Sequence, residues 1–285
     1  MSYEFEEGKM YMMPVHFGPA VTPRNNINNE RFIYDQPTTI TNHTLVYESD
    51  PTQLEKLLPP GFTLTAPYVV VNMNMLRNLA WLAGNGYNLV GVAIPAEYKG
   101  QEEKINGRLL MVMWENHADP ILTGREQLGY SKIFCDISDI ATYNNISRTK
   151  MSSWGFQFCE MTFDKNQEPE NLDELKSVLN NPKSDGIMHY KYFPRTGDGF
   201  SKADVQYVCL NPSNAKLPDD VKKYPVNDPV YCKGTIEWRI PTWEQMPTQH
   251  RVVEGLGGLE IKRYVGAVAT TNYSLGDLYS QRIIK

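Results

Sequence analysis

The stretch GREQLGYSKIF, residues 124 to 134, holds a single lysine, Lys132, between a Tyr-Ser pair and an Ile-Phe pair. The flanking segments RLLMVMWEN and KIFCDI are patterned as buried strands. A lysine amine attacks a ketone only when it is neutral, and burial disfavours its charged form. Lys132 is therefore a candidate nucleophile for imine formation. The alternative is a lysine at the start of a strand with its amine in water.

The strand alternation puts Lys132 on the same face as the aromatic ring of Phe134. Arg125 lies seven residues before the lysine, and a turn at Gly129 could bring the two together. A cation near the amine would also favour its neutral form. Glu126 would act in the opposite direction if it came close. The spacing predicts a desolvated lysine in an apolar pocket.

Composition bounds the class of protein. The chain has 285 residues, 41% hydrophobic and 21% charged, which suits one substantial core. A net charge of -5 without any run of Lys or Arg argues against a nucleic-acid partner. The acidic start MSYEFEEGKM lacks the pattern of a signal peptide, and no apolar run reaches the ~18 residues of a membrane span. We expect a cytoplasmic enzyme or binding protein.

The metal-ligating residue types are scattered along the chain. Neither CxxC nor HxH nor HExxH spacing occurs, so we expect neither a metal nor another cofactor. The cysteines are Cys135, Cys159, Cys209 and Cys232, and the histidines are His16, His43, His117, His189 and His250.

The pattern of apolar runs and breakers predicts a mostly β, α+β fold. Asp50 and Asn171 are expected to cap two short helices, the second over 172–180. Residues 1–37 are expected to form an irregular arm and 211–230 a loop insertion. We predict a curved antiparallel sheet that closes into a barrel-like structure, because closure removes exposed edges. The predicted strands are 67–76, 88–96, 108–115, 132–140, 153–163, 187–193, 204–210, 232–240 and 259–270.

The segment from Gly124 to Lys132 resembles the catalytic segment of the acetoacetate decarboxylase superfamily. Further segments resemble that family in the same order: MPVHFGPAVTPR, YESDPTQLEKLLPPGF, YNLVGVAIPAEYKG and YKYFPRTGDGFSKADV. The resemblance covers most of the chain and implies a single domain over 1–285. It also implies that Lys132 forms a Schiff base, since acetoacetate decarboxylase is a known case of a lysine activated by an adjacent cation. A homo-oligomer is a further implication of the resemblance.

Several charged positions of the family are replaced in this chain. The lysine that follows the nucleophile in acetoacetate decarboxylases is Ile133 here, and two strand glutamates fall at Leu89 and Asn72. The arginine for the substrate carboxylate falls near Ile40, although Arg24 or Arg31 could reach the same space. This pattern keeps the lysine and lacks most of the decarboxylation apparatus.

An iminium ion also supports aldol and dehydration chemistry, which requires a proton shuttle. The candidates are Glu126, Tyr130, Glu115, Tyr264 and Tyr273, with structural roles as alternatives. Glu126 is preferred because the family motif places it beside the lysine, and its alternative role is a salt bridge with Arg125. The candidate substrate-binding residues are Arg125, Asn72, Leu89, Trp114 and Arg24, with a core or subunit contact as the alternative for Trp114.

The sequence therefore favours a Schiff-base-forming lyase acting on a small keto acid or ketone, with aldolase or dehydratase chemistry. One alternative is a decarboxylase of a β-keto acid. Another is a non-catalytic barrel that binds a small apolar carbonyl compound. No nucleic-acid or membrane partner is expected, and an N-terminal arm rich in Met, Tyr and Phe favours a homo-oligomer.

Overall fold

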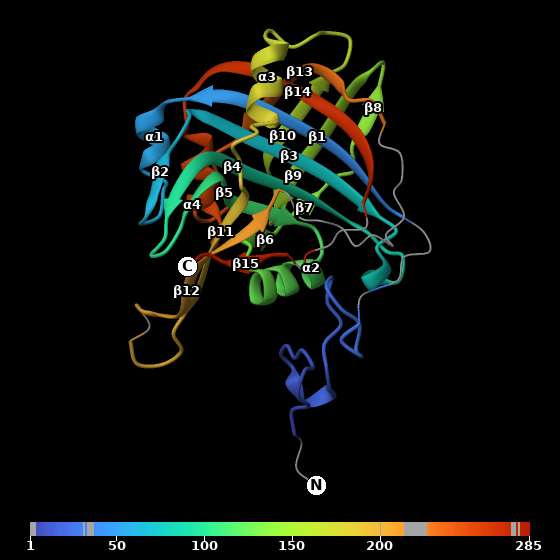
Figure 1. Ribbon diagram of the computed structural model, residues 1–285. Helices are drawn as coiled ribbons and strands as arrows, with labels where there is room; N and C mark the ends of the chain where they lie inside the picture. The colour runs from blue at the N-terminus through green and yellow to red at the C-terminus, as the bar shows by residue number, and fades with distance from the viewer. Residues whose placement is uncertain are drawn as a thin grey trace.

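The computed structural model describes residues 4–30, 32, 37–199, 201–213, 227–274, 278 and 280–285. Strands dominate, with a few short helices among them (Figure 1). The strands are β1 (Thr38–Ser49), β2 (Phe62–Leu64), β3 (Tyr68–Arg77), β4 (Tyr87–Lys99), β5 (Lys104–Glu115), β6 (Lys132–Phe134), β7 (Asp136–Ile137), β8 (Ala141–Tyr143), β9 (Ile146–Ser153), β10 (Phe156–Asp164), β11 (Gly186–Pro194), β12 (Ala203–Pro212), β13 (Val230–Trp238), β14 (Ile261–Ser274) and β15 (Arg282–Ile283).

The helices are all short. Asp50 accepts a hydrogen bond from the Gln53 backbone and caps the first α-helix, as expected. The same role falls to Asn171, which accepts from the Glu174 backbone. The helical segments are η1 (Val15–Phe17), α1 (Pro51–Glu55), η2 (Ala80–Leu82), α2 (Ala118–Thr123), η3 (Gly124–Leu128), α3 (Leu172–Leu179) and α4 (His250–Gly257).

The strands form one strongly curved, open sheet. Its path runs β15-β12-β11-β5-β4-β3-β1-β14-β13-β10-β9-β7, and no described strand pairs the two ends with each other. The expected closure into a barrel is therefore wrong, whereas the mostly β, curved sheet is confirmed. The sheet instead covers its apolar face by folding the β9, β10 and β13 region over β1, β3, β4 and β5 (Figure 1).

The main core lies between these two parts of the sheet. Trp114, Phe158 and Phe163 are fully buried there. The alternation of β5 sends Val112 and Trp114 into this core and Met113 and Glu115 to the opposite face. That opposite face carries the residues of the candidate site.

The structure describes only part of the predicted loop insertion at 211–230. Residues 211 and 212 end β12, and residues 214–226 lie outside the described residues. The predicted arm is irregular from residue 4 to residue 30 and projects away from the sheet (Figure 1). Arg31 lies outside the described residues. In the part of the chain that is described, no helix is long and apolar enough to cross a membrane.

Candidate active site around Lys132

Lys132 begins the short strand β6, which runs parallel to the end of β5. Met113 is its register partner, and Glu115 is the partner of Phe134 two residues later. The Lys132 side chain is only 8% exposed, whereas 48% of Phe134 is exposed. Ile133, Cys135 and Ile137 all pack in the main core, so the alternation continues beyond β6. Lys132 and Phe134 therefore face the other side of the strand, as predicted, but only the lysine is buried there. The prediction that Lys132 is buried is confirmed.

The Lys132 amine is held by one charged and one neutral oxygen. Its Nζ lies 2.8 Å from Oε1 of Glu115 and donates a hydrogen bond to the Pro120 carbonyl oxygen at 3.0 Å. The Tyr130 ring centroid lies 5.1 Å from the same nitrogen. The amine therefore has polar partners as well as an aromatic neighbour, which differs from the purely apolar pocket expected from its flanks.

Glu115 is completely buried, at 0% exposure. Burial raises the pKa of its carboxyl group, and the nearby Lys132 charge opposes that rise. The contact with Nζ is short but not aligned as a hydrogen bond, so neither carboxylate oxygen has a well-oriented donor among the described residues. A buried carboxylate without aligned donors is a strong proton acceptor. It lies next to the Lys132 amine, from which it could accept a proton.

The backbone around the lysine is shaped by two glycines of the GREQLG segment. Gly129 has φ of 76°, a left-handed conformation that ends η3 and turns the chain into β6. Gly124 lies so close to the lysine that a Cβ there would be 2.5 Å from Cδ and 2.6 Å from Nζ of Lys132. The missing side chain at Gly124 thus makes room for the lysine side chain.

Gly124→Ala is therefore expected to displace the amine without unfolding the protein. The clashing atoms are the far end of a flexible side chain, and alanine favours the helical backbone at this position. Borohydride trapping of a ketone on Lys132 should fall by about 100-fold, as for other small misplacements of a reacting group. Gly255→Ala is the matched control, because a Cβ there meets only Leu57 Cδ2, at 3.8 Å. Equal trapping in both variants would contradict the placement.

An aromatic pair extends the site beyond the lysine. The Tyr130 ring stacks on His189 with centroids 3.8 Å apart and planes at 29°. The Tyr130 hydroxyl accepts a hydrogen bond from Asn211 Nδ2 at 3.2 Å. Burial raises the pKa of Tyr130, so the phenol stays protonated and can serve as a neutral donor.

His189 is buried, and neither ring nitrogen has a hydrogen-bond partner among the described residues. Burial, followed by the Lys132 charge, lowers the pKa of His189 to about 3. The ring is neutral at physiological pH and offers one donor and one acceptor nitrogen. Its position was not predicted, because an isolated histidine in a strand carries no spacing signal.

Two of the predicted substrate-binding positions lie on the same sheet face as Glu115. Leu89 is the direct register partner of Glu115 on β4. Asn72 pairs with Gly91, and its Oδ1 lies close to that glycine, only 2.8 Å from where a Cβ would be. The structure thus brings Glu115 beside Leu89 on the same face of the sheet.

Three other predicted residues lie elsewhere. Trp114 faces the main core from the opposite side of β5, where its indole N–H donates to Gln249 Oε1 at 2.9 Å. Arg24 lies in the N-terminal arm. Glu126 is half-buried, and its backbone carbonyl accepts a hydrogen bond from Lys191 Nζ at 2.6 Å. In the described ranges, Glu126 forms no ion pair.

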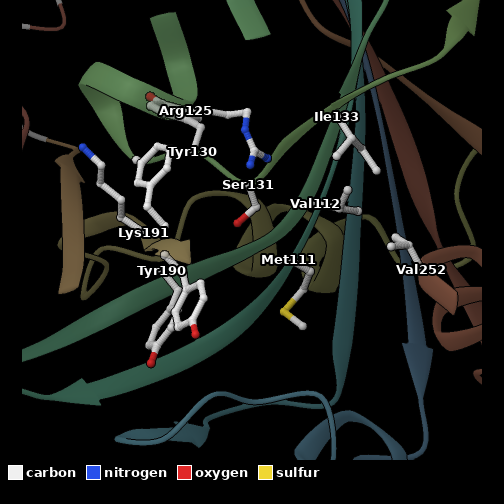
Figure 2. Close-up of a pocket in the computed structure, with 12 residues that line it drawn as sticks. Met111, Val112, Arg125, Tyr130, Ser131, Ile133, Tyr190, Lys191 and Val252 are labelled. Carbon is white, nitrogen blue, oxygen red and sulfur yellow. The ribbon is translucent and has the colours of Figure 1, made fainter. Parts of the chain in front are cut away.

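Arg125 lies next to the lysine but on the other side of β6. Its Nη1 donates to the Lys132 carbonyl oxygen at 2.8 Å. Together with Tyr130 and Ser131, Arg125 lines a pocket of about 250 Å³ (Figure 2). Ile133 lines this pocket and Lys132 does not, as expected for neighbours that point to opposite sides of a strand.

The described part of the chain contains no group of three His, Cys, Asp or Glu side chains placed to hold a metal ion. The four cysteines are buried and free.

A family model for acetoacetate decarboxylase (ADC) matches residues 12–273. The chain therefore belongs to the acetoacetate decarboxylase family. No match was found among curated proteins.

Solved structures with the same fold include acetoacetate decarboxylase from Legionella pneumophila subsp. pneumophila str. Philadelphia 1, with 17% identity, a TM-score of 0.56 and coverage of 90% of this chain and 91% of that one. An acetoacetate decarboxylase-like enzyme from Sphingomonas wittichii RW1 has 14% identity, a TM-score of 0.61 and coverage of 87% and 92%. The enduracididine biosynthesis enzyme MppR, solved with pyruvate, has 14% identity, a TM-score of 0.56 and coverage of 90% and 94%.

Proposed function

We propose that this protein is a lyase that binds a small keto acid or ketone as an imine on Lys132. The observation that carries the proposal is the buried pair of Lys132 and Glu115, with 2.8 Å between Nζ and Oε1. Family membership supports enzyme activity in general. Burying this pair costs folding free energy, because both charges lose their hydration, and a catalytic role would account for that cost.

The pair supplies the first and last proton transfers of imine formation. Glu115 takes a proton from the Lys132 ammonium, and the neutral amine attacks the carbonyl carbon. The nitrogen then passes one proton to the alkoxide oxygen, which gives a carbinolamine. The protonated Glu115 then returns its proton to the departing hydroxyl, which leaves as water as the iminium forms. Glu115 replaces Glu126 as the preferred shuttle in this proposal, because only Glu115 lies within reach of the amine.

The reaction that follows the imine is proposed to be aldol or dehydration chemistry. The iminium withdraws electrons from the adjacent carbon, so a base can remove a proton there to give an enamine. Tyr130 is proposed as a neutral donor beside this carbon. The MppR structures, solved with pyruvate and with a condensation product of pyruvate and imidazole 4-carboxaldehyde, support this choice by fold similarity.

Acetoacetate is expected to lose carbon dioxide slowly or not at all with this protein. Ile133 and Leu89 provide no charge next to the lysine, and Asn72 provides only an amide. The decarboxylase alternative depends on such charged groups around the lysine, and on an arginine for the substrate carboxylate at the position near Ile40. Carbon dioxide release from acetoacetate, compared with a boiled sample, measures this; efficient release would favour the decarboxylase alternative.

Borohydride reduction in the presence of a panel of ketones tests the proposed function. Pyruvate, acetoacetate and acetone should each be offered to the native protein, followed by mass mapping of the modified peptide. The expected adduct is on the peptide that contains Lys132. Ketone binding without any trapped adduct would favour the non-catalytic alternative.

We also propose that the protein is a homo-oligomer assembled through its N-terminal arm. Phe17 is 87% exposed and Met13 78%, and the arm forms a groove of about 420 Å³ with Trp81 and Leu122. A second copy of the chain would cover this apolar surface. Light scattering should give a multiple of the monomer mass, and the double variant Met13→Ser/Phe17→Ser should shift it toward the monomer. A monomeric native protein at micromolar concentration would refute the proposal.

A further inference from the structure

The pocket beside Arg125 fills a gap between two short strand ladders. On one edge of β5, β11 pairs with residues Gly107 to Leu109, and β6 pairs with residues Met113 to Glu115. Between them, residues 110–112 have no partner on this edge among the described strands. The two neighbouring strands diverge there, and the wedge between them is the pocket of about 250 Å³.

The wedge is lined by two cationic residues, Arg125 and Lys191, and by apolar and aromatic side chains. The Lys191 amine already donates a hydrogen bond to the Glu126 carbonyl oxygen. The Arg125 guanidinium and the Ser131 hydroxyl point toward the space above Met111 and Tyr190 (Figure 2). Arg125 donates one hydrogen bond, to the Lys132 carbonyl oxygen, and pairs with no carboxylate of the described residues. A guanidinium has five N–H donors in a planar fork, so the group retains the capacity for a bidentate carboxylate.

The wedge and the space around the Lys132 amine share the Tyr130 ring, which lines the wedge and lies 5.1 Å from Nζ, but their polar groups differ. The amine contacts Glu115 and Pro120, which do not line the wedge. Ser131 and Ile133 line it from the other side of β6. A ligand in the wedge therefore meets Arg125 without meeting the reacting nitrogen.

We propose that this wedge binds a small carboxylate whose apolar body is about the size of one ring, and that the bound ligand regulates Lys132 through Arg125. The volume suits such a ligand, since a cavity of about 150 Å³ accommodates benzene. Arg125 and Ser131 bind the carboxylate, and Met111, Tyr190 and Val252 surround the ring.

Regulation follows from the hydrogen bond between Arg125 and the Lys132 carbonyl oxygen. A carboxylate that engages the guanidinium competes with that carbonyl for its N–H groups. The strand β6 has only three residues, so a change at the Lys132 carbonyl is passed to the start of the lysine side chain. This regulatory part rests on the proposed function of Lys132, whereas ligand binding does not.

Benzoate is the probe, because it carries the carboxylate and the ring but cannot form an imine. Titration calorimetry should detect binding to the native protein and to Lys132→Ala, and benzyl alcohol should bind at least tenfold more weakly. Arg125→Gln should weaken benzoate by about tenfold or more. Val252→Phe, which fills the wedge and keeps Arg125, should abolish binding. Arg148→Gln, at an exposed arginine on β9, is the matched control.

The second measurement is the rate of pyruvate trapping by borohydride with and without benzoate. A several-fold change in the native protein that disappears in Val252→Phe supports regulation. Binding that survives in both Arg125→Gln and Val252→Phe, or no binding at all, overturns the site. Binding with an unchanged trapping rate overturns the regulation alone. Absence of any pyruvate adduct overturns the proposed function instead, while the calorimetric result still decides the site.

Discussion

Lys132→Arg is expected to abolish ketone trapping and turnover completely. Arginine keeps a positive charge opposite Glu115, but its guanidinium is never neutral at physiological pH and forms no imine with a ketone. A lysine that acted only by its charge would tolerate this change. The measurement is borohydride trapping of pyruvate with mass mapping, alongside circular dichroism to confirm the fold.

The matched control is Lys150→Arg, at a lysine whose side chain is 54% exposed on β9. This variant should trap and turn over like the native protein. Retained turnover in Lys132→Arg would refute the Schiff-base proposal. Lys132→Ala serves as a second variant, because the longer arginine could disturb the packing beside Gly124 whereas alanine could not.

The sequence and the structure lead to opposite expectations for the stability of Lys132→Ala. A desolvated lysine in an apolar pocket would leave the fold equally or more stable when removed. The structure instead pairs it with fully buried Glu115, so its removal leaves an unpaired carboxylate. The variant is therefore less stable at neutral pH, by up to about 3 kcal/mol, and recovers at low pH as Glu115 becomes protonated.

The sequence predicted the central strands well because their side chains are apolar over long runs. YVVVNMNMLR and RLLMVMWE lie in β3 and β5. β1 and β9 were not predicted. Both strands carry many polar residues, which face the second side of the sheet or solvent, so their sequences, TTITNHTLVYES and ISRTKMSS, resemble loops. The open sheet also escaped prediction, because closure depends on pairing between strands distant in sequence.

Within the site, the lysine was predictable and its partner was only one of several candidates. A lysine between apolar runs is a local signal. The choice of Glu115 over Glu126 depends on register: β6 pairs with the end of β5, which places Glu115 two residues from the partner of Lys132. Strand alternation gives the face of a side chain but not the neighbour across the sheet. The close approach at Gly124 likewise depends on tertiary packing.

Glu115→Gln is expected to slow imine formation by about 100-fold at neutral pH. Glutamine keeps the size of the side chain but cannot accept the proton from the Lys132 ammonium. In the native protein, the trapping rate should rise with pH through the raised pKa of Glu115, because the carboxylate must be ionised to act as a base. The variant should lack this dependence. Trapping measured over a pH series, with Glu160→Gln on β10 as the control, provides the test.

The same substitution has a stability signature whose sign follows from the raised pKa. Below the ordinary glutamate pKa of about 4.3, the folded and unfolded chains both hold the proton, and Glu115 costs little. As pH rises, the unfolded chain releases its proton before the folded one does, so the native protein loses stability up to the raised folded pKa. Glu115→Gln removes this loss, and its stability relative to the native protein should increase from about pH 4 up to the raised folded pKa of Glu115. A relative stability that falls over this range would mean that Glu115 is a fully compensated carboxylate, stabilised by Lys132, and not a base held ready for proton transfer.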